Sequence, residues 1–115
     1  SIDLAPTMLA LAGIDAPVSM QGKSLLPIIR QEPTNWRSQF YYQHTYNTDP
    51  PRSPIPVTEG IRTERWKYVR YPETEPLFEQ LFDLDADPLE RTNLASHAEH
   101  STILAQLRKR CDEVD

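Results

Sequence analysis

The fold of this chain is decided by residues 59–71, Glu-Gly-Ile-Arg-Thr-Glu-Arg-Trp-Lys-Tyr-Val-Arg-Tyr. Up to residue 63 the chain alternates, and two residues on one side, Val57 and Ile61, are apolar and β-branched. After a polar pair at 64 and 65, the alternation resumes with aromatic residues at 66 and 68. Alternation broken by a short polar pair is typical of a β-hairpin.

Two further strands are expected, one on each side of this hairpin. Residues 80–84 form one of them, because a break at 72–76 precedes them and a sharp Asp-Ala-Asp-Pro turn follows. Residues 40–44, Phe-Tyr-Tyr-Gln-His, form the other, since aromatic residues suit a half-buried sheet. The intervening loop at 45–56 contains four prolines, which exclude a regular strand or helix there.

An apolar stripe with helical spacing predicts the last helix. Its members are Ile103, Leu104, Leu107, Cys111 and Val114. Ser96 and Glu99 have the spacing of a capping box, which predicts Ser96 as the N-cap. We expect an α+β fold in which a small antiparallel sheet of about four strands packs against this C-terminal helix.

Helical signals also mark the N-terminal part of the chain. A helix is expected over Asp3–Ala12, with Asp3 as its N-cap and an apolar stripe along one side. Ser24 is expected to cap a short helical turn over residues 25–29.

Several segments, in order, resemble one known family. The hairpin is followed at 80–95 by Gln-Leu-Phe-Asp-Leu-Asp-Ala-Asp-Pro-Leu-Glu-Arg-Thr-Asn-Leu-Ala, and it is preceded by Asp-Leu-Ala-Pro-Thr-Met-Leu-Ala-Leu-Ala-Gly at 3–13 and Gln-Gly-Lys-Ser-Leu-Leu-Pro at 21–27. Together they resemble the C-terminal subdomain of the type I, formylglycine-dependent sulfatases (arylsulfatases) of the alkaline phosphatase superfamily. The resemblance implies that residues 1–30 are a connector and the end of the N-terminal sulfatase domain, with a helix that belongs with a missing α/β domain. It implies that residues 31–115 are the C-terminal subdomain.

The resemblance also implies a catalytic system that this sequence does not contain. Type I sulfatases use a formylglycine, made from Cys or Ser in a Cys/Ser-x-Pro/Ala-x-Arg motif, and a divalent cation, calcium. Cys111 is followed by Asp-Glu-Val-Asp, which does not match, and we expect it to be a packed thiol. We therefore assign no catalytic residue, metal ligand or cofactor to this chain and expect it to be inactive alone.

Two groups of residues could be metal ligands by type, but we interpret neither group as a metal site. Asp83, Asp85 and Asp87 alternate as in a calcium loop, but the glycine and the distal glutamate of an EF-hand are missing. His97 and His100 stand three apart without ligand partners in a recognised spacing. We expect a turn at the first group and a solvated helix end at the second.

Loops of the sulfatase C-terminal subdomain help to select the substrate, and this gives three candidate substrate-binding residues. His44 and Tyr46 lie where the strand at 40–44 enters the Pro-rich loop. A histidine there can donate to a sugar hydroxyl or a sulfate oxygen, and an aromatic ring can pack on a sugar. Arg62 adds positive charge near an anionic substrate. The structural alternatives are that His44 caps its strand and that Arg62 pairs with Glu59, Glu64 or another acidic residue.

The composition of the chain indicates which classes of partner it can bind. The formal net charge of −5 argues against nucleic acid, and no run of residues is long enough to span a membrane. A hydrophobic fraction of 38% with 11 prolines suggests that part of the surface meets a partner. That partner is expected to be the missing N-terminal catalytic domain, although an exposed apolar face also allows a homodimer. Export of the parent protein, to the periplasm, the exterior or the lysosome, stays open.

Three functions fit these observations. The first is the C-terminal fragment of a sulfatase that acts on a sulfated carbohydrate or an aryl sulfate, with this chain at the rim of the pocket. The second is a free-standing carbohydrate-binding or interaction module with the same fold. The third is the tail of a phosphoester or phosphonate hydrolase from the same superfamily.

Overall fold

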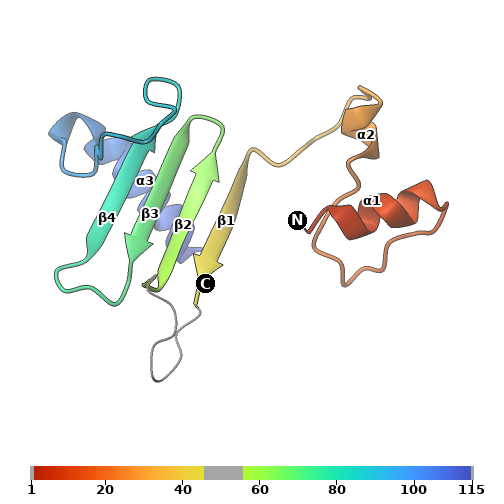
Figure 1. The fold of residues 1–115 in the computed structure, drawn as a ribbon, viewed down its shortest axis with the longest axis horizontal. Helices are drawn as coiled ribbons and strands as arrows, with labels where there is room; N and C mark the ends of the chain where they lie inside the picture. The colour runs from red at the N-terminus through yellow and green to blue at the C-terminus, as the bar shows by residue number, and fades with distance from the viewer. Residues whose placement is uncertain (1, 46–55, 115) are drawn as a thin grey trace. The chain divides into compact units, whose positions relative to one another are not determined.

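The computed structural model describes residues 2–45 and 56–114. Two compact units make up the chain, Ser1–Trp36 and Arg37–Asp115. Helices form the first unit, and a four-stranded sheet with a long helix forms the second (Figure 1). The assignment of residues 1–30 to the end of another domain stays a prediction.

In the first unit, α1 (Leu4–Leu11) and α2 (Leu26–Ile29) are joined by a loop that folds back on α1. The buried side chain of Thr7 fixes this loop. Its hydroxyl accepts the N–H of Leu25 at 2.9 Å and donates to the carbonyl oxygen of Asp3 at 2.6 Å. One threonine therefore links the start of α1 to the start of α2.

Asp3 is the N-cap residue of α1, as predicted, but its side chain makes no capping hydrogen bond. The backbone of Asp3 is already helical, and its carboxylate accepts the N–H of Lys23 at 2.9 Å instead of an N–H of its own helix. The carboxylate that would cap α1 is thus bonded to a residue 20 positions away in the chain. The N-cap residue of α2 is Leu25, so the prediction of Ser24 as its cap is wrong, although Oγ of Ser24 accepts the N–H of Leu26 at 3.2 Å.

The apolar stripe of α1 remains uncovered within this unit. Leu4, Met8 and Leu11 expose 52%, 67% and 68% of their surface. The buried residues of the helix are instead Pro6 and Thr7. The unit therefore does not bury its own hydrophobic stripe.

The second unit is built on an antiparallel sheet whose strands lie in chain order, which confirms the predicted fold class (Figure 1). Its strands are β1 (Gln39–His44), β2 (Thr58–Thr63), β3 (Trp66–Tyr71) and β4 (Phe78–Asp83). The predicted hairpin is confirmed as the antiparallel pair β2 and β3. Thr63 stabilises its turn, because its Oγ1 accepts the N–H of Trp66 at 2.8 Å.

Helix α3 (Ser101–Asp112) covers one face of the sheet, which we call the inner face. The core between them consists of Ile61, Tyr68 and Leu81 from the sheet and Leu104, Leu107 and Cys111 from the helix. Each of these side chains exposes 6% of its surface or less. The predicted stripe is thus confirmed at its centre, and Cys111 is the packed thiol that the sequence indicated.

Helix α3 begins later than the capping box predicts. A single 3-10 turn, η1 (Ala98–His100), precedes it, and the N-cap residue of that turn is His97, without a side-chain cap bond. The prediction of Ser96 as N-cap is therefore wrong. Val114 lies beyond the end of the helix and exposes 50% of its surface, so it does not extend the core.

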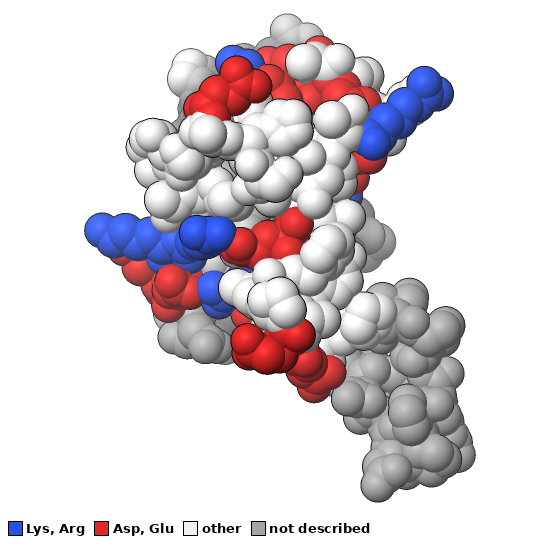
Figure 2. Space-filling model, turned by 90° about the vertical axis from the view of Figure 1, so that its left-hand side faces the viewer, with Lys and Arg blue, Asp and Glu red and all other residues white. Residues whose placement is uncertain are grey.

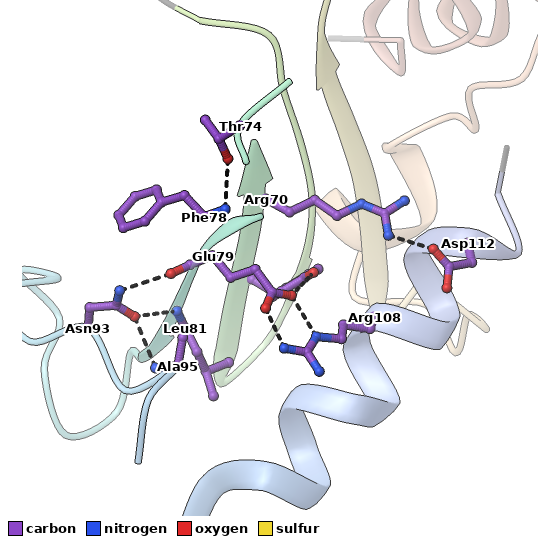
Figure 3. Close-up of polar contacts among 10 residues, drawn as sticks. Arg70, Thr74, Phe78, Glu79, Leu81, Asn93, Ala95, Arg108 and Asp112 are labelled. Carbon is purple, nitrogen blue, oxygen red and sulfur yellow. Dashed lines mark hydrogen bonds and ion pairs between the residues drawn. The ribbon is translucent and has the colours of Figure 1, made fainter. Parts of the chain in front are cut away.

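Ion pairs fix α3 on the sheet (Figure 3). Glu79 of β4 accepts both the Nε and an Nη group of Arg108, and it also accepts the hydroxyl of Tyr68 at 2.6 Å. Arg70 of β3 donates to Asp112 near the end of α3. Arg108 therefore joins α3 to β4.

Asn93 closes the free edge of β4 (Figure 3). Its Oδ1 accepts the N–H groups of Leu81 and Ala95, each at 3.0 Å, and its Nδ2 donates to the carbonyl oxygen of Glu79 at 2.9 Å. The N–H of Leu94 then donates to the carbonyl oxygen of Leu81 at 2.8 Å. The segment before α3 thus occupies edge groups that would otherwise be open to strand pairing.

Candidate functional site

The sheet has a second face, opposite α3, which we call the outer face. Directly paired residues of neighbouring strands point to the same side, so the register identifies its members. They are Phe40, Tyr42, His44, Thr58, Gly60, Arg62, Lys67, Val69, Tyr71, Phe78, Gln80 and Phe82. Two of the predicted substrate-binding residues, His44 and Arg62, therefore lie on this face.

Aromatic side chains occupy both edges of the outer face. On β1 the ring centroids of Phe40 and Tyr42 are 6.4 Å apart, and those of Tyr71 and Phe78, on β3 and β4, are 5.2 Å apart. Phe40 and Phe78 expose 49% and 48% of their surface. The outer face thus presents apolar rings where the inner face has a closed core.

Gly60 is required where the side chain of Tyr42 crosses β2. A Cβ atom at Gly60 would lie 2.8 Å from the hydroxyl oxygen of Tyr42 and 2.2 Å from the carbonyl oxygen of Tyr68. Both distances are shorter than any van der Waals contact, and the nearer atom belongs to the backbone. This packing gives a physical reason for the glycine of the Gly-Ile-Arg-Thr segment.

Two buried polar atoms of this face lack a hydrogen-bond partner in the part of the chain that the structure describes. They are the hydroxyl oxygen of Tyr42 and Nε2 of His44. Burial raises the pKa of Tyr42 to about 12, so its hydroxyl keeps its proton at neutral pH and can donate. A buried polar group without a partner costs roughly 1–3 kcal/mol, which makes both atoms candidates for bonds to a group outside this chain.

Positive charge gathers at the hairpin end of the outer face. Arg62 of β2 pairs directly with Lys67 of β3, and two like charges opposite each other destabilise a sheet. Lys67 forms an ion pair with Glu90, whose backbone has a positive φ of 53°. Among residues 2–45 and 56–114, no acidic side chain pairs with Arg62. The predicted alternative partner Glu59 is engaged by Arg70 instead, at 2.9 Å.

The register separates the predicted substrate-binding residues. His44 pairs with Thr58, and Arg62 pairs with Phe40, so the two lie four positions apart along β1 and β2. At about 3.3 Å per residue, this is a separation of roughly 13 Å. Tyr46 and the rest of the Pro-rich loop at 46–55 lie outside the described residues. The assignment of all three residues to the substrate stays a prediction.

The residues that sequence reasoning missed are those of the polar network on the inner face. Glu59 accepts the hydroxyl of Tyr41 at 2.7 Å as well as the guanidinium of Arg70. The hydrogen bond from Arg108 lowers the pKa of Glu79, so this carboxylate stays charged. Alternation predicts strands at Tyr41, Glu59 and Arg70 but gives no signal for their partners. Glu79 lies just before the strand predicted at 80–84, whereas β4 begins at Phe78.

Charged side chains are mixed across the face that Figure 2 shows, which looks onto the β4 side of the molecule. Basic and acidic groups lie next to one another there, with uncharged residues between them. This view shows no extended basic patch of the kind that binds a nucleic-acid backbone. None of the described helices has the length and the apolar character needed to cross a membrane.

The residues present do not fit the calcium ion or the formylglycine that the resemblance implies. The described residues contain no group of three His, Cys, Asp or Glu side chains that could hold a metal ion. Asp83 forms a bidentate ion pair with Arg65. Asp87 accepts the N–H of Thr92 at 2.8 Å as part of a turn. Cys111 is fully buried in the core. No catalytic step is therefore assigned to these residues.

Comparison with known proteins identifies the class. Residues 1–115 match the family described as N-sulphoglucosamine sulphohydrolase, C-terminal. The chain is 32% identical over 116 residues to an N-acetylglucosamine-6-O-sulfatase of Bacteroides thetaiotaomicron, covering 98% of this chain and 20% of the relative. It is 34% identical over 104 residues to human arylsulfatase K, covering 82% of this chain and 18% of the relative.

Solved structures agree with this result. A protein solved in complex with its substrate, D-glucosamine-2-N,6-O-disulfate, is similar with a TM-score of 0.82 and 30% identity, over 97% of this chain and 23% of that protein. A phosphonate monoester hydrolase of Agrobacterium radiobacter shares the fold, with a TM-score of 0.72 and 24% identity, over 94% and 23% of the two chains.

The fold and these matches define a C-terminal subdomain of the sulfatases in the alkaline phosphatase superfamily. The chain belongs to the N-sulphoglucosamine sulphohydrolase C-terminal family. It spans about a fifth of the length of the curated relatives, 20% of the N-acetylglucosamine-6-O-sulfatase and 18% of arylsulfatase K.

Proposed function

We propose that this chain acts as the C-terminal part of a sulfatase that hydrolyses sulfate esters, joined to a catalytic domain of the same polypeptide. The observation that carries the proposal is the match of residues 1–115 to a sulfatase C-terminal family. The preceding domain would supply the formylglycine and the divalent cation. The role of this chain is then to pack against that domain and to complete the substrate pocket.

The end of β1 is the part of the chain proposed to reach the pocket. Nε2 of His44 is buried without a hydrogen-bond partner in the described residues, and a sugar hydroxyl or a sulfate oxygen would satisfy it. Tyr46, two residues further along the chain, is proposed to pack on the sugar ring. Arg62 is roughly 13 Å from His44 along the sheet and could contact only another part of an extended substrate.

Sulfated amino sugars are the proposed substrate class. One relative is named as an N-acetylglucosamine-6-O-sulfatase, and a similar protein was solved in complex with its substrate, D-glucosamine-2-N,6-O-disulfate. A sulfated hexosamine offers the two features that His44 and an aromatic residue can recognise, namely polar oxygens and an apolar ring face.

The test uses the full-length enzyme, assayed on 6-O-sulfated and N-sulfated glucosamine. We expect measurable release of sulfate, and we expect His44→Ala to raise KM about tenfold or more with little change in kcat. His97→Ala is the matched control, because His97 is a partly exposed histidine before α3 and should leave KM unchanged. An unchanged KM for His44→Ala would remove this histidine from the pocket, and no sulfate release from any sulfated sugar would contradict the function.

A phosphonate or phosphate ester hydrolase is the second candidate. It is favoured by the 32% identity, over 114 residues, to the multifunctional alkaline phosphatase superfamily protein PehA of Trinickia caryophylli. That match covers 90% of this chain and 22% of the relative. A ratio of kcat/KM values that favours an aryl phosphonate monoester over sulfated glucosamine would support this candidate and contradict the first.

A further inference from the structure

The end of the sheet at which β1 reaches His44 carries a continuous polar network on its inner face. Glu59 of β2 is at the centre of this network, and both of its carboxylate oxygens are bound. Oε2 accepts the hydroxyl of Tyr41 on β1 at 2.7 Å, and Oε1 accepts Nε of Arg70 on β3 at 2.9 Å. Arg70 also donates to Asp112, the last residue of α3 (Figure 3). The network therefore joins three strands to the helix.

This network is buried, and it lies close to His44. Glu59 exposes 7% of its surface, and the side chain of Arg70 exposes 16%. In the register of β1 and β2, Glu59 pairs with Gln43, and the adjacent Thr58 pairs with His44. Glu59 therefore lies one position from the histidine that is proposed to bind the substrate, on the opposite face of the sheet.

Stability alone does not account for a buried ion pair at this position. Removing two charges from water costs about as much as their attraction returns, and well-packed apolar residues of similar volume are often equally stabilising. Charge-assisted hydrogen bonds instead fix geometry, because they are made only when the groups meet at the correct distance and angle. The strand that such bonds would fix is β1, which lies at the edge of the sheet and ends at His44.

We propose that Glu59 is a positioning residue for substrate binding. Through the hydroxyl of Tyr41 it fixes the end of β1, and with it the imidazole of His44, in the orientation that the substrate meets. Arg70 holds the carboxylate from β3, and Asp112 holds Arg70 from α3. Glu59 itself does not touch the substrate, since it lies on the inner face. The inference rests on the proposed function, from which it takes the role of His44.

A second network on the inner face provides a matched control. Glu79 of β4 accepts the hydroxyl of Tyr68 at 2.6 Å and is bound by Arg108. Tyr68→Phe and Tyr41→Phe therefore each remove a tyrosine hydroxyl from a glutamate that an arginine also binds. Only the second change affects β1, because Tyr68 and Glu79 belong to β3 and β4. An effect at His44 that follows from Tyr41→Phe alone thus separates positioning from a general loosening of the sheet.

The first measurement is hydrogen exchange of the full-length enzyme without substrate, in peptides that cover β1. Tyr41→Phe removes one bond of the network, and Glu59→Gln offers one acceptor oxygen in place of two. We expect each to raise the exchange rate of β1 about tenfold, because an edge strand opens locally when its side-chain bonds are lost. Tyr68→Phe should leave that rate unchanged. Unchanged exchange of β1 in Tyr41→Phe and Glu59→Gln, or an equal increase in Tyr68→Phe, would overturn the proposal.

The second measurement separates KM from kcat on sulfated glucosamine. Tyr41→Phe and Glu59→Gln should each raise KM about threefold without changing kcat, because they weaken binding and not the chemical step. In the His44→Ala background neither should raise KM further, since no imidazole is left to position. An increase of the same size in that background would contradict the proposal.

The same data distinguish this inference from the function on which it rests. If His44→Ala raises KM but Tyr41→Phe and Glu59→Gln do not, the positioning role of Glu59 fails while His44 keeps its place in the pocket. If His44→Ala leaves KM unchanged, the assignment of His44 to the substrate fails, and the positioning role fails with it.

Discussion

The two faces of the sheet differ in how completely their polar and apolar groups are satisfied. On the inner face, α3 buries Tyr68 and Leu81 completely, and the carboxylate of Glu79 is bound by both Arg108 and Tyr68. On the outer face, a buried tyrosine hydroxyl and a histidine nitrogen lack partners in the described chain. The inner face is therefore satisfied within this chain, whereas among the described residues the outer face leaves two buried polar atoms without a partner.

The largest effect is expected in the inner core. Leu107 is fully buried between α3 and the sheet. Leu107→Ala should lower the free energy of unfolding by about 2–5 kcal/mol, because the removed atoms leave a cavity in a packed core. Chemical denaturation of the 115-residue chain measures this change. A loss below 1 kcal/mol would mean that α3 is not firmly packed on the inner face.

Gly60 is the outer-face position at which a single methyl group matters. Gly60→Ala places a Cβ atom 2.2 Å from a backbone oxygen of β3, so the strands must separate or the ring of Tyr42 must move. We expect a loss of roughly 1–3 kcal/mol in the free energy of unfolding. In the double variant Gly60→Ala/Tyr42→Ala, the clash with the Tyr42 ring is removed but the clash with the backbone oxygen of Tyr68 remains. The stability lost through Gly60→Ala should therefore be regained only in part. Full stability in Gly60→Ala would contradict the observed approach of β2 and β3.

Asn93 tests the closure of the β4 edge. Asn93→Ala removes three hydrogen bonds to backbone groups and should cost about 1–2 kcal/mol. Asn93→Asp is the matched variant, since it keeps the acceptor for Leu81 and Ala95 and loses only the donor to Glu79. Thermal melts should place it between the wild type and Asn93→Ala. A ranking in which Asn93→Asp is less stable than Asn93→Ala would contradict this division of roles.

Acid sensitivity should come from the inner face. The pKa of Glu79 is lowered in the folded state, chiefly by the hydrogen bond from Arg108, and that of Asp83 is lowered chiefly by Arg65. A carboxylate with a lowered pKa stabilises the fold above its unfolded pKa, near 4, and this contribution is lost as pH falls through the folded value. Glu79→Gln should flatten the decline in stability below about pH 4.5. An identical pH profile in this variant would exclude Glu79 as a source.

The smallest effect in this chain is expected for Phe40. Its ring is half exposed, so Phe40→Ala should change the free energy of unfolding of the 115-residue chain by no more than about 0.5 kcal/mol. In the full-length enzyme the same substitution should cost at least 1 kcal/mol more, because the ring would then be buried by the catalytic domain. Equal effects in the two proteins would mean that Phe40 remains exposed in both.

The strands could be predicted from the sequence because each has an alternating pattern that its neighbours share. The hairpin at 58–71 and the core stripe of α3 follow from periodicity alone. The bonds at the helix starts could not be predicted from local motifs, because Asp3 is the N-cap residue of α1 but its carboxylate binds the N–H of Lys23. Ser96 likewise fails as a cap because η1 begins only at Ala98.

For the candidate site, the sequence predicts which strands carry the residues but not the distances between them. His44 and Arg62 do share one face, but the register that places them four positions apart depends on how β1 pairs with β2 across a 13-residue connection from 45 to 57. The roles of Tyr42 and Gly60 come from a close approach across strands, and no spacing in the sequence signals it. The counter-charge of Lys67, which pairs with Arg62, comes from Glu90, which is 23 positions away from Lys67 in the chain.

The most direct test of the comparison is hydroxyl-radical footprinting of the unmodified full-length enzyme. Phe40 and Phe78 expose about half of their surface in this chain, and Leu89 exposes 67% of its surface outside the outer face. Our account predicts that both phenylalanines are oxidised as slowly as the buried Phe82, while Leu89 reacts at the rate of an exposed leucine. Rapid oxidation of both phenylalanines would show that the outer face is open to water in the whole enzyme and would contradict a protein surface packed against it.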